Sequence, residues 1–196
     1  MRIAHISVYG VLSVTQGIVT DTTIYTGKPG AAGRLPKEMA SYALLDHLGI
    51  AYTRLDHAPA MSVADCEEVE KLLGIEISKN LLLKNTRGEL FMLMMPGGKR
   101  FDSSAVSRQI GSTRLSFTDA QTMEQAVNIS PGSLSVMGLM HDTAHRVRLL
   151  IDRDILEYEY FGCHPCVNTA SLKICMDDLL GRLLPHTGHE PTIVTL

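Results

Sequence analysis

The chain has 196 residues, of which 45% are hydrophobic and 20% charged, values close to the average for globular proteins. They exclude a collagen-like, low-complexity or disordered chain, and no apolar run reaches the roughly 18 residues that a membrane-spanning helix requires. With 18 basic and 21 acidic residues the net charge is −3, so any nucleic-acid partner has to bind a local basic patch. Because the N-terminus has no basic segment followed by an apolar stretch, we expect a cytoplasmic protein.

The first 35 residues differ in composition from the rest of the chain. Val, Ile, Thr and Tyr are frequent up to Tyr25, and three glycines follow within residues 27–33. Strand-forming residues followed by a flexible segment predict a β hairpin or an appended arm. We therefore expect an N-terminal extension over residues 1–35 and a main domain over residues 36–196.

Helices and strands are expected to alternate irregularly in the main domain. Pro36 suits the first position of a helix that Gly49 ends, and an apolar run on each side of residues 85–88 predicts a hairpin. The expected helices cover residues 36–49, 62–74, 103–110, 118–127 and 176–184, and the expected strands 50–57, 80–84, 90–95, 146–152, 169–175 and 192–196. This order favours a mixed-sheet α/β or α+β domain over a doubly wound parallel sheet.

Basic residues gather between Lys79 and Arg114. This segment has seven basic and two acidic residues, a balance of +5, whereas the rest of the chain has 11 basic and 19 acidic residues, a balance of −8. A local basic face on an acidic protein is compatible with docking of a phosphate backbone. An ordinary solvated hairpin and helix surface explains the same charges.

Three short motifs suggest chemistry that their context does not favour. Residues 96–99 (Pro-Gly-Gly-Lys) lack the spacer of a phosphate-binding loop, so a tight turn is expected. His141 and His145 have the spacing of zinc ligands on a helix, yet no glutamate lies between them. Cys163 and Cys166 form a late Cys-x-x-Cys pair without a second pair, which argues against a redox or zinc centre. We expect no metal and no cofactor.

Lys79 stands next to Asn80, where residues 75–78 meet the apolar run of residues 81–83. A lysine at the mouth of a strand can place its charge in a pocket while its stem packs on apolar walls, although an ordinary surface position also accounts for it. The chain has no Gly-x-Ser-x-Gly motif, and no carboxylate pair stands out as an acid/base couple.

Seven sequence blocks, taken together, resemble one protein family. They are residues 44–50 with His57-Ala58-Pro59, residues 78–83, 96–102, 114–117, 131–139, 162–170 and 187–191. In this order they resemble the YbaK-like aminoacyl-tRNA deacylases, the free-standing relatives of the editing domain of bacterial prolyl-tRNA synthetases. Within that family they are most similar to the branch that hydrolyses alanyl-tRNA(Pro). The resemblance covers about residues 36–196 and implies the editing-domain fold, a mixed β-sheet core surrounded by helices.

The resemblance implies hydrolysis of an aminoacyl ester at the 3′ end of tRNA(Pro), with alanine as the wrongly attached amino acid. By the family motif, Lys79 contacts the phosphate of the terminal nucleotide and Asn80 helps to position the same end. The loop Gly162–Pro165 wraps the aminoacyl group, and its backbone helps to hold the carbonyl and the attacking water. The implied site consists of catalytic Lys79, Gly162 and His164 and of substrate-binding Asn80, Ser135, Gly138, Cys163 and Pro165.

This reaction needs no protein nucleophile, because an aminoacyl ester is already activated and the ribose 2′-hydroxyl can position a water or relay a proton. The expected partner is the acceptor end of tRNA(Pro), with prolyl-tRNA synthetase or an elongation factor as further partners, and neither DNA nor a membrane. Two alternatives stay open, a catalytically inactive RNA-binding or regulatory module on the same fold and a deacylase for mischarged serine or cysteine. The basic segment Lys79–Arg114 motivates the first, and Val136-Met137, Cys163 and Cys166 motivate both, because the family usually has other side chains there.

Overall fold

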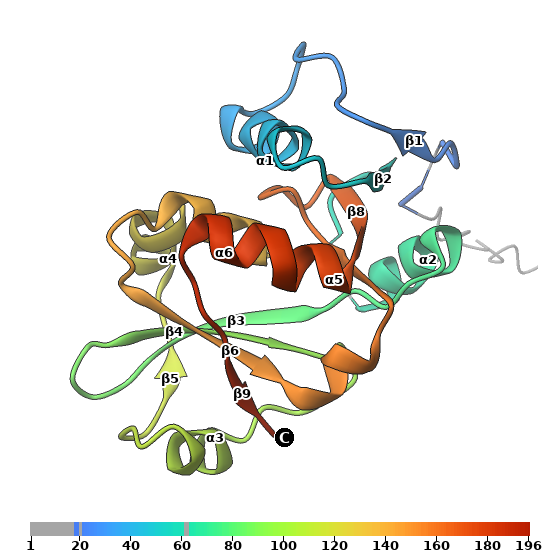
Figure 1. Ribbon diagram of the computed structural model, residues 1–196. Helices are drawn as coiled ribbons and strands as arrows, with labels where there is room; N and C mark the ends of the chain where they lie inside the picture. Colours follow the sequence, from blue (N-terminus) through green and yellow to red (C-terminus); the bar gives the residue numbers. More distant parts are fainter. Residues whose placement is uncertain (1–17, 20, 61–62) are drawn as a thin grey trace, which may run out of the picture.

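The computed structural model describes residues 18–19, 21–60 and 63–196, and two β-sheets form its centre (Figure 1). The first sheet is antiparallel, with the strand order β1 (Tyr25–Thr26), β2 (Tyr52–Asp56), β8 (Ala170–Cys175) and β7 (Tyr160–Cys163). The second has the order β5 (Ser116–Phe117), β3 (Lys79–Lys84), β4 (Leu90–Met95), β6 (Val147–Asp152) and β9 (Thr192–Val194). Because β3 is antiparallel to both neighbours while β4, β6 and β9 are parallel, the expected mixed sheet is confirmed.

Helices cover both sheets. They are α1 (Pro36–His47), α2 (Val63–Leu73), α3 (Ser103–Gln109), α4 (Ala120–Val127), α5 (Met176–Asp178) and α6 (Leu184–Thr187), with 3-10 helices η1 (Val136–His141) and η2 (Arg153–Glu157) and a π-helical turn η3 (Leu179–Leu183). Asp102 and Asp119 begin α3 and α4, since their carboxylates accept backbone N–H groups of the first turn. In Figure 1, α5 and α6 lie on one side of the second sheet and α3 on the other.

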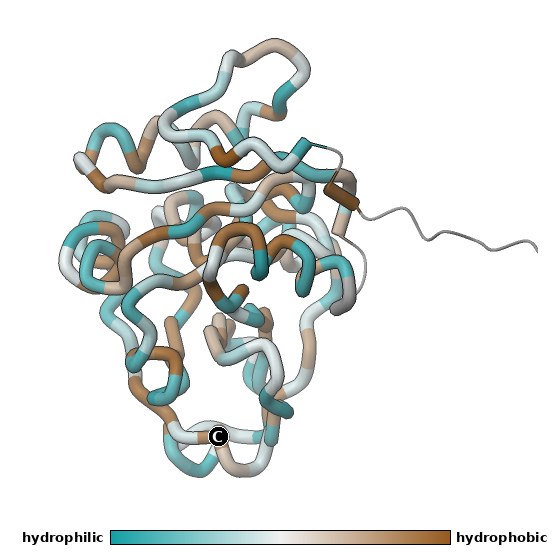
Figure 2. Tube along the Cα trace, turned by 90° about the vertical axis from the view of Figure 1, so that its right-hand side faces the viewer, coloured by the Kyte–Doolittle hydropathy of each residue, from teal (hydrophilic) through white to brown (hydrophobic). Residues whose placement is uncertain are grey.

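Each face of the second sheet packs against its own hydrophobic cluster. Met92 and Met94 of β4 point into the larger cluster with α4, α5 and α6, a side that we call the main-core face. Leu93 and Met95 point into a smaller cluster with α3, the α3 face. Both faces are buried because β4 is apolar at every position. Figure 2 shows hydrophilic and hydrophobic stretches alternating along the outer helices, as expected for elements that bury one side.

The segment before α1 contacts the domain. Within β1, Tyr25 pairs with Arg54 of β2, and the guanidinium of Arg34 forms ion pairs with Glu38 and Asp56. Part of the expected hairpin or arm falls on residues 1–17, which lie outside the described residues, and the domain boundary at residue 35 stays a prediction. Among the described residues, no helix has the length and apolar character needed to cross a membrane.

Most expected elements of the main domain are present within a few residues, but two strands are not predicted by the sequence. Strand β7 is four residues long and contains Gly162, and β5 has only two residues. Both are short enough that hydrogen bonds to a partner strand, rather than their own residue pattern, determine them. The expected helix over residues 176–184 is present but contains the π-helical turn η3.

Candidate active site

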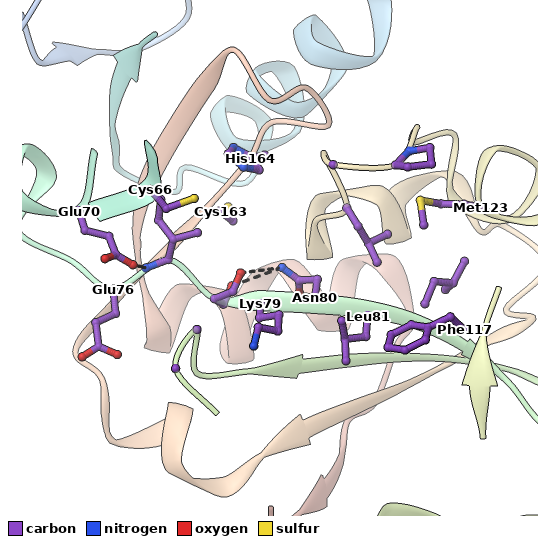
Figure 3. Close-up of a pocket in the computed structure, with 18 of the residues that line it drawn as sticks. Cys66, Glu70, Glu76, Lys79, Asn80, Leu81, Phe117, Met123, Cys163 and His164 are labelled. Carbon is purple, nitrogen blue, oxygen red and sulfur yellow. Dashed lines mark hydrogen bonds between the residues drawn. The ribbon is translucent and has the colours of Figure 1, made fainter. Parts of the chain in front are cut away.

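A cavity of about 640 Å³ lies along β3 (Figure 3). Strand β5 pairs only with Leu83 and Lys84, so the first part of β3 has an open edge on this side. The cavity walls come from α2, the segment before β3, the turn after β4, β5, α4, the loop before η1 and the end of β7. An open strand edge lined by seven separate segments is a concave site of the kind that binds small ligands.

Strand β3 divides this cavity into two sides. Lys79 pairs with Met95 across the β3–β4 ladder, so its side chain shares the α3 face, whereas Asn80 pairs with Met94 and shares the main-core face. Phe117 pairs with Leu83 and therefore belongs to the α3 face. Figure 3 shows Lys79, Leu81 and Phe117 on one side of the β3 ribbon and Cys163, His164 and Met123 on the other.

Asn80 carries an unsatisfied acceptor on the main-core face. Its Nδ2 donates to the carbonyl oxygen of Ser78 at 3.2 Å and lies 3.4 Å from the Ser78 hydroxyl. Because that carbonyl can only accept, the amide orientation is determined and Oδ1 faces away from Ser78. Oδ1 is buried and has no hydrogen-bond partner in the described part of the chain. A buried acceptor without a partner costs about 1–3 kcal/mol, which a bound ligand or water can recover.

His164 presents a second acceptor to the same cavity. Its Nδ1 lies 2.9 Å from the carbonyl oxygen of Ala170, so Nδ1 carries the proton of the neutral ring. Burial lowers the pKa of His164, and the neighbouring His57 lowers it further. The ring is therefore neutral at pH 7 and its Nε2 is a lone-pair acceptor, with no partner among the residues that the structure describes.

His57 and Ser171 lie behind His164. His57 Nδ1 is 2.8 Å from the carbonyl oxygen of Ala58, which leaves Nε2 to accept from the Ser171 hydroxyl at 3.0 Å. Burial lowers the pKa of His57 as well. The Ser171 oxygen is also 3.4 Å from His164 Nδ1. Sequence reasoning assigned no role to either residue. His57 stands in one of the seven blocks, but nothing in the local sequence distinguishes Ser171.

Lys79 provides a cation on the α3 face. Its Nζ donates to the carbonyl oxygen of Lys99 at 2.8 Å, and no carboxylate lies within ion-pair distance of it among the described residues. The Lys99 ammonium is in turn bound by Asp152 and Asp154, each at 2.7 Å. These contacts hold the Lys79 side chain at the open edge of β3 with its charge uncompensated, an arrangement suited to an anion.

Gly162 does not line the cavity. Its N–H donates to the Glu76 carbonyl at 3.0 Å, and its own carbonyl accepts from the backbone N–H and the hydroxyl of Ser78, both at 3.1 Å. The backbone of Gly162 is thus fully used in joining β7 to the segment before β3. A Cβ at this position would lie 2.5 Å from Ile75 Cδ1, so only glycine allows this close approach.

The other expected site residues lie at or behind the cavity wall. Cys163 is part of the wall, and burial raises the pKa of its thiol to about 12. Ser135, Gly138 and Pro165 are buried and do not line the cavity. Of the eight expected residues, the structure thus brings Lys79, Asn80, Cys163 and His164 together in one cavity.

Three glutamates that the sequence did not single out line the end of the cavity near α2. They are Glu67, Glu70 and Glu76. Glu70 Oε1 accepts the backbone N–H of Ile77 at 2.8 Å, and Glu76 accepts the hydroxyl of Tyr158. This end of the cavity is therefore negative, whereas the Lys79 side is positive. Among the described residues, no group of three His, Cys, Asp or Glu side chains is arranged to hold a metal ion.

Comparisons with known proteins agree on one family. Residues 57–181 match the model of the aminoacyl-tRNA editing domain. The chain is 26% identical over 143 residues to the prolyl-tRNA editing protein ProX of Acetoanaerobium sticklandii, which covers 72% of this chain and 87% of that protein. It is 27% identical over 164 residues to the prolyl-tRNA synthetase associated domain-containing protein 1 of Danio rerio. That match covers 82% of this chain and 87% of the Danio rerio protein. A solved structure described as a candidate trans-editing enzyme for prolyl tRNA synthetase has the same fold, with a TM-score of 0.61 and 16% identity. The superposition covers 84% of this chain and 99% of that one.

Proposed function

This chain belongs to the aminoacyl-tRNA editing domain family, whose members are deacylases, and from that premise we propose that it removes alanine from mischarged tRNA(Pro) in trans. The names of the relatives support tRNA(Pro) as the substrate class. In the reaction a water oxygen bonds to the ester carbonyl carbon and the bond to the ribose 3′-oxygen breaks. One water proton passes to that oxygen, which leaves as a hydroxyl.

The observation that carries this proposal is a pair of acceptors in residues that line the cavity, the buried Asn80 Oδ1, which has no partner, and His164 Nε2, for which no hydrogen bond is found among the described residues. Each acceptor can hold a water by one of its hydrogens, which leaves an oxygen lone pair free to attack the carbonyl carbon. His164 orients this water rather than deprotonating it, since burial lowers the pKa of the ring. The ribose 2′-hydroxyl then relays the proton to the leaving 3′-oxygen.

In this arrangement the substrate crosses the open edge of β3. The terminal nucleotide lies on the α3 side, where the ammonium of Lys79 binds its phosphate, and the amino acid lies on the main-core side. The negative end near Glu70 and Glu76 attracts the α-ammonium group of the amino acid. Gly162 and Ser135 act by position, the first by joining β7 to the segment before β3 and the second by supporting the wall at Cys163.

Selectivity for alanine over proline follows from the close packing of the side chains that line the amino-acid side of the cavity. Leu82, Met123, Leu134 and Cys163 surround the amino-acid side, and each belongs to or packs against the main cluster. A close-packed wall of this kind accommodates extra methylene groups only at a cost of about 1–3 kcal/mol. The prolyl ring is larger than the alanyl methyl group by two methylenes, so it is rejected by size.

The test is single-turnover deacylation of alanyl-tRNA(Pro) beside prolyl-tRNA(Pro), with Lys79→Ala as the negative control. Two His164 variants form a matched pair. Asparagine keeps a donor for the Ala170 carbonyl but has no acceptor in the place of Nε2, whereas glutamine supplies that acceptor. We expect release of alanine alone, loss of activity in Lys79→Ala and His164→Asn, and partial retention in His164→Gln. RNA binding without turnover of either ester would favour the inactive module, and release of serine or cysteine instead of alanine would change the assigned amino acid.

A further inference from the structure

Phe117 is the most exposed large hydrophobic side chain in the described part of the protein, at 62% of its surface. It lines the cavity on the α3 side, beyond Leu81 and at the opposite end from His164 (Figure 3). Single exposed hydrophobic residues are common on protein surfaces and by themselves indicate nothing. Phe117 differs from such isolated residues in the contacts that its ring makes.

The Phe117 ring is supported from one side. Its backbone pairs with Leu83 of β3, and its ring meets that of Phe101 edge to face, with the centroids 5.9 Å apart and an interplanar angle of 64°. Phe101 packs against the cluster on the α3 face. An aromatic ring with such a contact at the mouth of a cavity offers an open face to a flat ligand, and with two side-chain torsions it has little side-chain entropy to lose on binding.

Phe101 also lines a second hollow, of about 580 Å³. Two arginines line it, Arg100 and Arg114, together with Asp102 and two serines of α3. Neither arginine has a carboxylate within ion-pair distance in residues 18–19, 21–60 and 63–196. The Asp102 carboxylate is already engaged, because it accepts the backbone N–H groups of Ser104 and Ala105. The side chains that line the hollow therefore carry a net charge of +1, and neither arginine is paired with Asp102.

We propose that Phe117 is a stacking platform for a base in the unpaired 3′ strand of the RNA substrate, and that Arg100 and Arg114 bind the phosphates of that strand. An exposed aromatic ring beside cations that form no ion pair is the combination that single-stranded nucleic acids require, since every base has a face to stack and every nucleotide a phosphate. This inference rests on the proposed function, because it assigns a path to the substrate of the same cavity.

The path runs along one face of the protein. Lys79 and Leu83 are four residues apart on β3, a distance of about 13 Å at the rise of a strand, and Phe117 lies beside Leu83. The ester-bearing nucleotide occupies the Lys79 end, so the base on Phe117 belongs to a nucleotide that precedes it. The strand then continues over Phe101 into the arginine-lined hollow. Stacking tolerates any base, so this contact adds affinity without adding sequence specificity.

The first experiment measures binding of a fluorescent single-stranded RNA ending in CCA, without an amino acid, to the wild-type protein, Phe117→Leu and Phe117→Trp. We expect the leucine variant to bind about tenfold more weakly and the tryptophan variant to bind at least as tightly as the wild type. Tyr160→Leu is the matched control, since Tyr160 is 40% exposed and does not line the cavity. Equal affinity of wild type and Phe117→Leu would overturn the proposal, as would a failure of tryptophan to restore binding.

The second experiment separates this inference from the proposed function. Phe117→Leu should raise KM for alanyl-tRNA(Pro) about tenfold with kcat unchanged, yet should not affect hydrolysis of 3′-O-alanyl-adenosine 5′-monophosphate, which keeps the terminal phosphate but has no preceding nucleotide. If the wild type binds RNA through Phe117 but hydrolyses neither ester, the proposed function fails and the stacking platform stands. If both esters are hydrolysed and the leucine variant matches the wild type on each, the platform fails and the function stands.

The arginines are tested by salt dependence. For single strands, each phosphate contact contributes about 0.7 to the slope of log K against log salt concentration. Arg100→Gln and Arg114→Gln should each lower the slope by about that amount. Arg108→Gln provides the control, because Arg108 is exposed on α3 and does not line the hollow. A slope unchanged in both variants would contradict phosphate binding at this hollow.

Discussion

The Ser171 hydroxyl lies 3.0 Å from His57 Nε2 and so joins two segments that are 114 positions apart in the sequence. The same oxygen is 3.4 Å from His164 Nδ1, and the two imidazole rings have their centroids 6.1 Å apart. Each ring donates its Nδ1 proton to a backbone carbonyl, so both are held in the same neutral tautomer. The Ser171 hydroxyl thus lies between two neutral imidazole rings.

The first prediction concerns the pH dependence of stability. Burial lowers the pKa of His57, His141 and His164 in the folded state below the usual value of 6.5. Below about pH 6.5 the unfolded chain therefore binds protons that the folded chain does not, and the free energy of unfolding falls as the pH decreases. Urea unfolding at several pH values measures this slope. His57→Gln should show a smaller slope than the wild type, and an identical slope would contradict the assignment.

A second prediction concerns Gly162. In Gly162→Ala the new Cβ would meet Ile75 Cδ1 at 2.5 Å and Ile77 Cγ1 at 2.8 Å, so β7 has to move away from the segment before β3. We expect a loss of about 1–3 kcal/mol in the free energy of unfolding. Deacylation should also slow, because β7 carries Cys163 and leads directly into His164.

Gly181→Ala is the control for this comparison. A Cβ at position 181 meets no atom within 4 Å, and the residue is exposed in η3. In a helical segment the change from glycine to alanine stabilises by about 0.5–1 kcal/mol. Equal denaturation midpoints for the two variants would show that the approach of β7 to Ile75 and Ile77 is looser than the structure indicates.

Lys99 is predicted to matter more for stability than its position in a surface turn implies. Its ammonium lies 2.7 Å from Asp152, whose side chain is completely buried, and 2.7 Å from the exposed Asp154. In Lys99→Met the Asp152 carboxylate is left without its cation, which should cost about 3 kcal/mol in unfolding free energy. Asp154→Asn removes only an exposed partner and should cost less than about 1 kcal/mol. Thermal or urea denaturation of both variants distinguishes the two cases, and a similar loss in each would refute the argument.

The cysteine pair is predicted to be chemically inert. The described cysteines are free thiols, and burial raises the pKa to about 12 for Cys163 and about 11 for Cys166. A thiolate is the reactive species, so these two thiols should resist alkylation at neutral pH. Peptide mass spectrometry after brief treatment of the native protein with iodoacetamide should find adducts on Cys66 and Cys175 before either of them. A disulfide between Cys163 and Cys166 after mild oxidation would revive the redox interpretation.

The sequence predicts features of the fold that depend on neighbouring residues better than it predicts the composition of the site. The β3–β4 hairpin and the caps of α3 and α4 can be predicted because local residues determine them, namely two apolar runs around a turn and the carboxylates of Asp102 and Asp119. The opposite directions of Lys79 and Asn80 also follow from the alternation of side chains along a strand. Such features need only neighbours in sequence.

Features that depend on distant segments could not be predicted in this way. Ser171 is one small polar residue in an apolar strand, and only the packing of β2 against β8 brings it to His57. Phe117 lies outside the strands expected from the sequence, and only the pairing of β5 with Leu83 and Lys84 places its ring beside the open edge of β3. The resemblance supplied Gly162 as a site residue, but only the structure shows that its backbone bonds are already used.

The distance in sequence between His57 and Ser171 has a consequence for synthesis of the protein in the cell. Strand β2 leaves the ribosome long before β8, its central partner, is translated. During that interval the nascent chain exposes an unpaired strand edge and the apolar residues beside it, a state that favours aggregation. Non-local pairing of this kind also slows folding. We therefore expect the yield of folded protein to depend on chaperones that shield nascent chains, and to rise when translation is slowed by lower temperature.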